Sequence, residues 1–139
     1  MKKTDELLKI LNDSHDIGDV LQDHEEEFIQ VSVSEYLTAL IEQKNLVKSE
    51  IIKRSGIDRV YGYQILNGTR TPSRDKLIQF AFGMQLGFRE TQRLLAYNGF
   101  AQLYAKNRRD SIIIFAIKEK KSVIELNIIL DKNEEKIFE

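Results

Sequence analysis

Arginine, tyrosine and glutamine side chains gather within residues 59–64, at spacings that place them on one face of a helix. The group comprises Arg59, Val60, Tyr63 and Gln64, near the start of a helix that we predict over about residues 59–67. Arginine can pair with the major-groove edge of guanine, and glutamine with that of adenine, each through two hydrogen bonds. These residue types therefore suit the reading of DNA bases. The alternative is an ordinary exposed helix in a bundle that binds no DNA.

A preceding helix and a tight turn must position this group. Ile51, Ile52 and Ser55 fall at helical spacing and predict one buried face of a helix that starts near residue 48. Gly56 then lets the backbone leave that helix through a positive φ. Asp58 can cap the next helix by accepting hydrogen bonds from its first amides. The pattern predicts a helix-turn-helix.

An ordered set of residues extends this pattern: Ile51, Ile52, Gly56, Ile57, Ile65, Gly68, Pro72, Ser73, Leu77 and Ala81. Through this set, residues 34–97 resemble the λ-repressor/Cro-like regulators, often called the XRE family. The resemblance implies an all-α, five-helix DNA-binding domain whose second helix-turn-helix helix reads the major groove. Two positions depart from the family pattern, because Ile52 stands where the family usually has alanine and Gly62 where it usually has isoleucine or valine. We interpret this as a large and a small residue exchanged across one helix contact, and the alternative is that Tyr61 fills the gap.

Six further side chains are candidates for contacts with DNA phosphates. They lie at expected helix starts or in the loop after the reading helix, where amides, hydroxyls and cations can grip a phosphate. The alternative for each is a surface residue that only aids solubility. The six are Lys48, Ser49, Arg70, Thr71, Arg74 and Lys76.

Charge is distributed unevenly along the 139 residues, although the net charge is only −1. Residues 46–76 and 77–109 each carry +4, whereas residues 1–30 carry −6. A basic segment centred on the reading helix is typical of a DNA-binding protein. The acidic amino-terminal region is instead a candidate binding site for a protein partner.

Several functional classes are disfavoured by what the sequence lacks. It has no cysteine, and its two histidines, His15 and His24, follow no standard metal-ligand spacing. Nucleotide-binding and hydrolase motifs, a signal peptide and a long apolar span are also missing. We therefore expect a cytoplasmic protein that is not an enzyme and needs no cofactor, metal or membrane.

The whole chain reads as helical, since it has one proline and seven glycines and no convincing strand pattern. We expect an acidic extension over residues 1–32, with helices at about 5–12 and 19–29. A DNA-binding domain over residues 33–99 follows, and then a helical hairpin over residues 100–139. We detect no internal repeat. The remaining predicted helices cover about residues 35–44 with a Ser34 cap, 74–85 with a Ser73 cap, 89–97, 109–118, and 123–130 with a Ser122–Glu125 capping box.

The carboxy-terminal hairpin contains more isoleucine, valine and leucine than it can bury within itself. We interpret the excess as the interface of a homodimer. The alternative is that the hairpin folds back onto the domain and closes one monomeric core. The interface candidates are Ile113, Ile117, Ile124 and Ile128.

Together these features predict a sequence-specific regulator of transcription that binds double-stranded DNA. The second hypothesis, from a different class, is a helical adaptor or antitoxin-like module that binds a protein partner.

Overall fold

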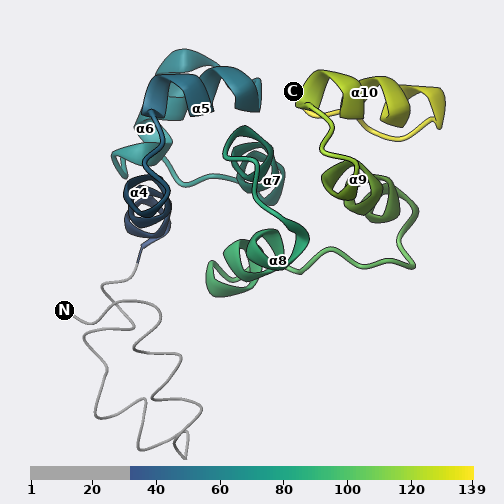
Figure 1. Ribbon diagram of the computed structural model, residues 1–139, viewed down its shortest axis with the longest axis horizontal. Coiled ribbons are helices and arrows are strands. Elements are labelled where there is room, and N and C mark those ends of the chain that lie inside the picture. Colours follow the sequence, from purple (N-terminus) through teal and green to yellow (C-terminus); the bar gives the residue numbers. More distant parts are fainter. Residues whose placement is uncertain (1–31) are drawn as a thin grey trace, which may run out of the picture.

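The computed structural model describes residues 32–139, and every regular element in that range is a helix (Figure 1). The expectation of an all-α protein is confirmed for this part of the chain. The helices predicted at 5–12 and 19–29 lie outside the described residues. The seven helices are α4 (Val33–Gln43), α5 (Lys48–Ser55), α6 (Arg59–Leu66), α7 (Arg74–Gly83), α8 (Phe88–Tyr97), α9 (Arg108–Lys118) and α10 (Val123–Lys132).

Side-chain caps fix most of the helix starts. The hydroxyl of Ser73 accepts a hydrogen bond from the Lys76 amide at 3.2 Å, as predicted for α7. The predicted Ser34 cap of α4 is wrong, because Ser32 is the N-cap and accepts from the Glu35 amide at 3.2 Å. Both serines precede a similar apolar pattern, so residue type alone did not separate them.

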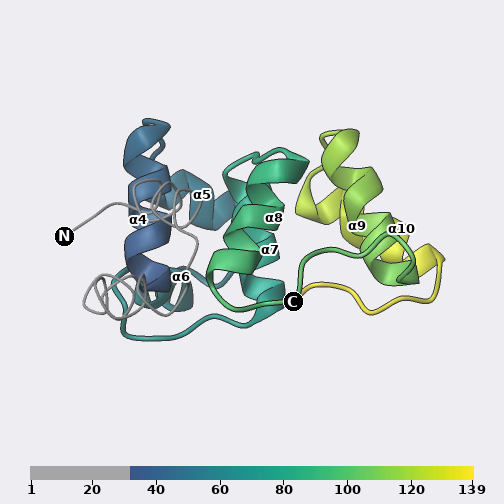
Figure 2. The same ribbon diagram turned by 90° about the horizontal axis from the view of Figure 1, so that it is seen from below.

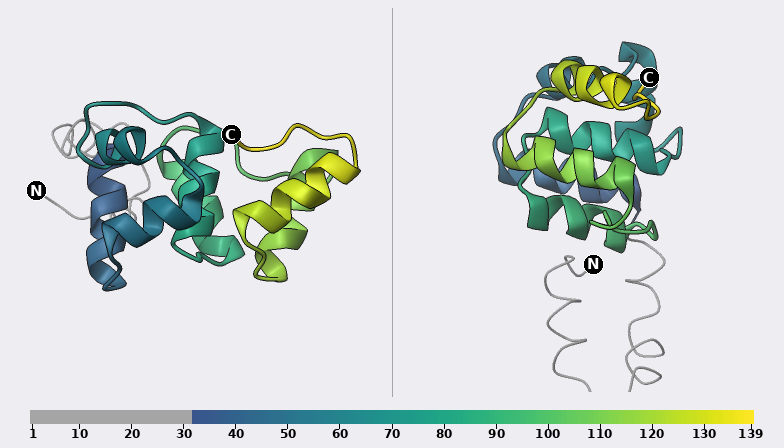
Figure 3. Two further views of the ribbon diagram at one scale, coloured as in Figure 1. Left: turned by 90° about the horizontal axis from the view of Figure 1, so that it is seen from above. Right: turned by 90° about the vertical axis from the view of Figure 1, so that its right-hand side faces the viewer.

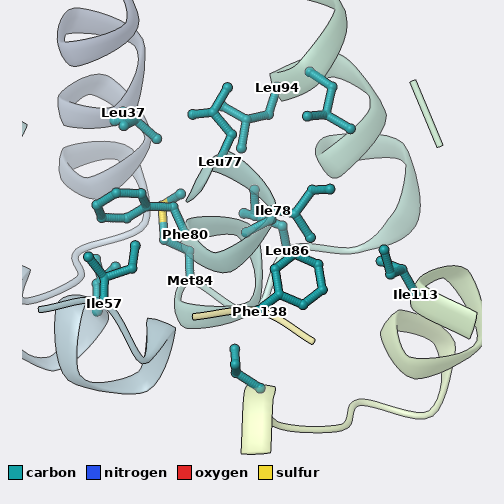
Figure 4. Packing of buried hydrophobic residues seen from close by; sticks show 14 of the residues in the cluster. Leu37, Ile57, Leu77, Ile78, Phe80, Met84, Leu86, Leu94, Ile113 and Phe138 are labelled. Atoms are coloured by element: carbon teal, nitrogen blue, oxygen red, sulfur yellow. The ribbon is translucent and has the colours of Figure 1, made fainter. Parts of the chain in front are cut away.

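Helix α7 forms the centre of the core. Leu77, Ile78 and Phe80 of this helix have no exposed surface, and even the side chain of Gln79 is buried. α5 packs against one side of α7 and α8 against another. Figure 4 shows Leu37 of α4, Leu94 of α8 and Ile113 of α9 directed toward the same apolar interior. The core is therefore continuous from α4 to α9.

The carboxy-terminal hairpin α9–α10 folds back onto the rest of the molecule. It lies at the opposite end from α4 in two perpendicular views (Figures 1 and 2), with α9 against α8 and α10 against α7. Ile113 is 0% exposed, so its assignment to a dimer interface is wrong for this structure. The buried side chains of this region join the core cluster of the domain; they are Ile113, Ala116, Val123, Leu126, Leu130 and Phe138.

The expectation that the chain has no internal repeat is wrong, because α7–α8 and α9–α10 are two similar units placed 35 residues apart. α8 and α10 have equal lengths and start 35 residues apart. Gln85 and Lys120, also 35 apart, both adopt φ of 55° in the turn between the helices of each unit. Eight positions carry the same residue in both units. The identical pairs are Arg74 and Arg109, Asp75 and Asp110, Ile78 and Ile113, Phe80 and Phe115, Ala81 and Ala116, Glu90 and Glu125, Leu95 and Leu130, and Asn98 and Asn133.

The segment after each hairpin repeats as well. The amide side chain of Gln92 in α8 binds both the N–H and the C=O of Leu103, at 2.7 and 2.9 Å. Asn127 in α10 binds the N–H and the C=O of Phe138 in the same way, at 2.8 and 2.9 Å. Leu103 and Phe138 are both buried. The repeated unit is therefore a hairpin followed by a segment that its own second helix holds in place.

Two ion pairs join the repeated units reciprocally. Arg74 binds Asp110 through two bonds of 3.2 and 2.9 Å, and Arg109 binds Asp75 through two bonds of 3.0 Å. The arginine of each unit thus contacts the aspartate of the other unit. This reciprocal pattern is that of an isologous contact, in which the two units are related by a two-fold axis. Such a contact is closed, and it pairs these four side chains within the chain.

Candidate nucleic-acid interface

The α5–α6 unit has the predicted helix, turn and helix. α5 ends at Ser55, whose buried hydroxyl donates to the Ile51 carbonyl at 2.6 Å. Gly56 follows with φ of 69°, in the left-handed region that glycine tolerates best. Ile57 is buried in the turn, and Asp58 caps α6 by accepting from the Tyr61 amide at 3.1 Å. Each of these residues has the role that its type predicted.

The contact between α5 and α6 depends on Gly62. A Cβ atom at this position would lie 2.7 Å from Cγ2 and 3.0 Å from Cγ1 of Ile52. Cβ atoms essentially never approach a neighbour so closely, so a residue larger than glycine at position 62 would force a shift at the contact with Ile52. Ile52 and Gly62 therefore meet across this contact, as the interpretation of a large and a small residue exchanged there requires.

The four predicted base-reading residues divide into two classes. Arg59 and Val60 are exposed, Val60 to 65%. Tyr63 and Gln64 are half-buried, and Tyr63 packs against the core. In the part of the chain that the structure describes, the side chains of Arg59 and Gln64 make no hydrogen bond or ion pair. Their polar groups remain available to a ligand.

The start of α5 has exposed polar groups and no side-chain cap. Val47, its N-cap residue, cannot accept a hydrogen bond from the first amides, and Lys48 and Ser49 beside it are exposed. The first amides of a helix have no partner within the helix. Together with the positive end of the helix dipole and a lysine, they can bind an anion such as a phosphate.

The loop between α6 and α7 presents the next pair of candidates. Gly68 has φ of 86°, and the Arg70 amide donates to the Gln64 carbonyl at 3.1 Å, which ties the loop to the end of α6. The side chains of Arg70 and Thr71 are exposed. The guanidinium of Arg70 makes no hydrogen bond or ion pair within residues 32–139.

Arg74 and Lys76 have roles that their sequence positions did not reveal. Besides its ion pair with Asp110, Arg74 donates to the carbonyls of Ala101 and Gln102 at 2.8 and 3.1 Å. The ammonium of Lys76 donates to the Glu139 carbonyl. Both cations are engaged inside the molecule, so we leave them out of the proposed DNA contacts. The partners are 25 or more residues away in sequence, so no local pattern could have identified them.

No protein-family model, curated protein or solved structure matches this chain.

Proposed function

We propose that this protein is a transcriptional regulator that binds double-stranded DNA through α5 and α6, within a five-helix λ-repressor-like domain formed by α4–α8. The observation that carries the proposal is the α5–α6 geometry, with its glycine turn and close helix contact. The side chains of Arg59 and Gln64 on α6 make no hydrogen bond or ion pair within residues 32–139. α6 enters the major groove with its amino-terminal half toward the bases. Arg59 and Gln64 select the sequence, and Val60 offers apolar contact to a thymine methyl group.

Contacts to the DNA backbone hold α6 in register. The uncapped start of α5, with Lys48 and Ser49, binds one phosphate, and Arg70 with Thr71 binds another after α6. The two groups lie at the start of α5 and in the loop that follows α6, so they flank the reading helix in the chain. None of the helices in residues 32–139 is long and apolar enough to cross a membrane.

Selection of bound sites from a random duplex library tests the proposal directly. An enriched sequence is expected, bound far more tightly than random duplex. Failure to enrich any sequence, with no salt-dependent affinity for DNA, would contradict the proposal and favour a protein-binding module.

Variants of the reading helix test the base contacts. Arg59→Ala and Gln64→Ala should each weaken binding to the selected site by about 1–3 kcal/mol more than binding to random duplex. Arg93→Ala is a matched control, because Arg93 is an exposed arginine on α8 and α7 lies between α8 and α5. Equal losses on both DNAs would remove Arg59 and Gln64 from the base-reading set.

Variants of the flanking cations test the phosphate contacts. Lys48→Ala and Arg70→Ala should weaken binding to every sequence by similar factors. Each should also reduce the slope of log affinity against log salt concentration by about 0.9 if one phosphate contact is lost. An unchanged slope would show that the side chain lies away from the DNA backbone.

A further inference from the structure

A tight turn at residues 104–107 leads into α9. The Asn107 amide donates to the Tyr104 carbonyl at 2.9 Å, which closes the turn. Asp110 of α9 holds the start of the turn by accepting from the Tyr104 amide at 3.0 Å. The Asn107 side chain holds its end by accepting from the Asp110 amide at 2.9 Å. The backbone at the tip of the turn, residues 105 and 106, is therefore fixed from both sides.

The segment that contains this turn is attached to the start of α7. Arg74, in the first turn of α7, donates to the carbonyls of Ala101 and Gln102 at 2.8 and 3.1 Å. The loop with Arg70 and Thr71, the proposed site of a DNA phosphate, ends where α7 begins. Figure 3 (left) shows α6, the loop after it and the segment from α8 to α9 along one edge of the molecule, and Figure 2 shows this edge from the opposite side. The segment with the turn thus lies on the same edge as the proposed DNA-reading helix.

The internal repeat gives the two loops equivalent places. Thr71 lies three residues before Arg74, and Lys106 lies three residues before Arg109. The reciprocal ion pairs of these two arginines bring the starts of α7 and α9 together. The loop before α7 and the turn before α9 therefore meet at one junction between the two units.

The turn exposes a cation and a phenol group. Lys106 is exposed, and its ammonium makes no hydrogen bond or ion pair within residues 32–139. Tyr104 is 60% exposed, and its hydroxyl makes no hydrogen bond in that range either. Arg108 at the start of α9 is exposed as well, but its guanidinium lies 3.4 Å from the Glu135 carboxylate. Lysine and tyrosine side chains both bind DNA phosphates, and Lys106 and Tyr104 have no bond to another side chain to break first.

We propose that Lys106 and the Tyr104 hydroxyl bind a phosphate of the DNA backbone, so that the second repeated unit extends the DNA-binding surface beyond the helix-turn-helix. This inference rests on the proposed DNA binding and adds to it a site outside α4–α8. Phosphate contacts fix the position of a protein on the duplex and carry no sequence information directly. The contact should therefore strengthen binding to every sequence by similar factors.

The salt dependence with which the full chain binds random duplex DNA tests this contact. Lys106→Ala should reduce the slope of log affinity against log salt concentration by about 0.9, so between about 50 and 200 mM salt the wild type should lose about threefold more affinity than this variant. Lys106→Arg keeps the cation and should keep the wild-type slope. Tyr104→Phe removes only the hydroxyl and should weaken binding about two- to tenfold on every sequence, as expected for one hydrogen bond. Lys118→Ala is the matched control, because Lys118 is an exposed lysine in the last turn of α9, at the other end of that helix.

The outcomes distinguish this inference from the proposed function. If Lys48→Ala and Arg70→Ala reduce the slope while Lys106→Ala does not, the second contact is overturned and the helix-turn-helix proposal stands. Equal changes for Lys106→Ala and Lys118→Ala would show a general effect of net charge and would also overturn it. A wild-type chain without salt-dependent affinity for duplex DNA overturns both proposals. Because Lys106 lies at an exposed turn, its variants should fold, and thermal unfolding checks this.

Discussion

The contact between α5 and α6 can be tested by adding a single carbon atom. Gly62→Ala places a Cβ atom 2.7 Å from Cγ2 of Ile52. This methyl group is attached directly to Cβ of a β-branched side chain, whose χ1 angle has one strongly preferred value in a helix. Relief of the clash therefore requires a shift of one helix rather than a rotation of a flexible chain end.

The expected size follows from two opposing contributions. Replacing a helix-interior glycine by alanine stabilises a helix by about 1 kcal/mol. Overpacking a core contact costs about 1–3 kcal/mol. The net effect of Gly62→Ala should therefore be a loss of about 0–2 kcal/mol in the wild-type background. In an Ile52→Ala background the clash is absent, and the same change should stabilise by about 1 kcal/mol.

A double-mutant cycle measured by urea denaturation separates these contributions. The difference between the two backgrounds should be about 1–3 kcal/mol, which isolates the coupling between positions 52 and 62. Ile52→Ala alone should cost about 2–5 kcal/mol, because it leaves a cavity at a buried site. Gly62→Ala that stabilises equally in both backgrounds would refute the size exchange and, with it, the close contact between α5 and α6.

Three further predictions concern the ion pairs and caps. Arg109→Ala should lower the free energy of unfolding by about 2 kcal/mol or more, since it removes two charged hydrogen bonds to Asp75, and urea denaturation measures the loss. Ser122→Ala should cost about 1 kcal/mol in the same measurement, because Ser122 is the N-cap of α10. Burial raises the pKa of Glu90, but hydrogen bonds from Lys44 and from the backbone outweigh it and leave that pKa lowered. The ionised Glu90 side chain therefore stabilises the fold above its unfolded-state pKa, and this stabilisation is lost as pH falls through its folded-state pKa. Glu90→Gln should lower the free energy of unfolding at neutral pH and have no effect on it in acid.

Local signals predicted the local structure well. Asp58, Ser73 and the Ser122–Glu125 capping box act as the sequence indicated, because capping involves only amides three residues away. The compensating pair at positions 52 and 62 was also predictable. There, Ile52 is larger and Gly62 smaller than the residues that the resemblance to the λ-repressor/Cro-like family implies at these positions.

Contacts between distant segments were not predictable in the same way. Ile113 and Ile124 are the same residue type in the same apolar-rich segment, yet one is fully buried and the other is mostly exposed. Which of them faces the core depends on how the hairpin docks on α7 and α8. Arg74 is another such residue. Its position at a helix start suits a phosphate contact as well as an ion pair within the chain, and only the folded structure shows that Asp110 lies beside it.

The repeat also changes how the charge of the central segment should be counted. Residues 46–109 carry +8 in sequence, which includes Arg74 and Arg109. Each of these arginines binds an aspartate at the start of the other unit, so both cations are neutralised at the junction between the units. The positive charge that remains near the helix-turn-helix comes from α5, α6 and the loop after α6, where five cations are exposed: Lys48, Lys53, Arg54, Arg59 and Arg70. Arg54 lies beside Glu50, and the proposed DNA contacts include Lys48, Arg59 and Arg70. A survey of the salt dependence of the proposed DNA binding should therefore find its large effects at the phosphate-contact candidates Lys48 and Arg70 and small ones at folded variants of Arg74 and Arg109, although the sequence assigns all four to one basic region.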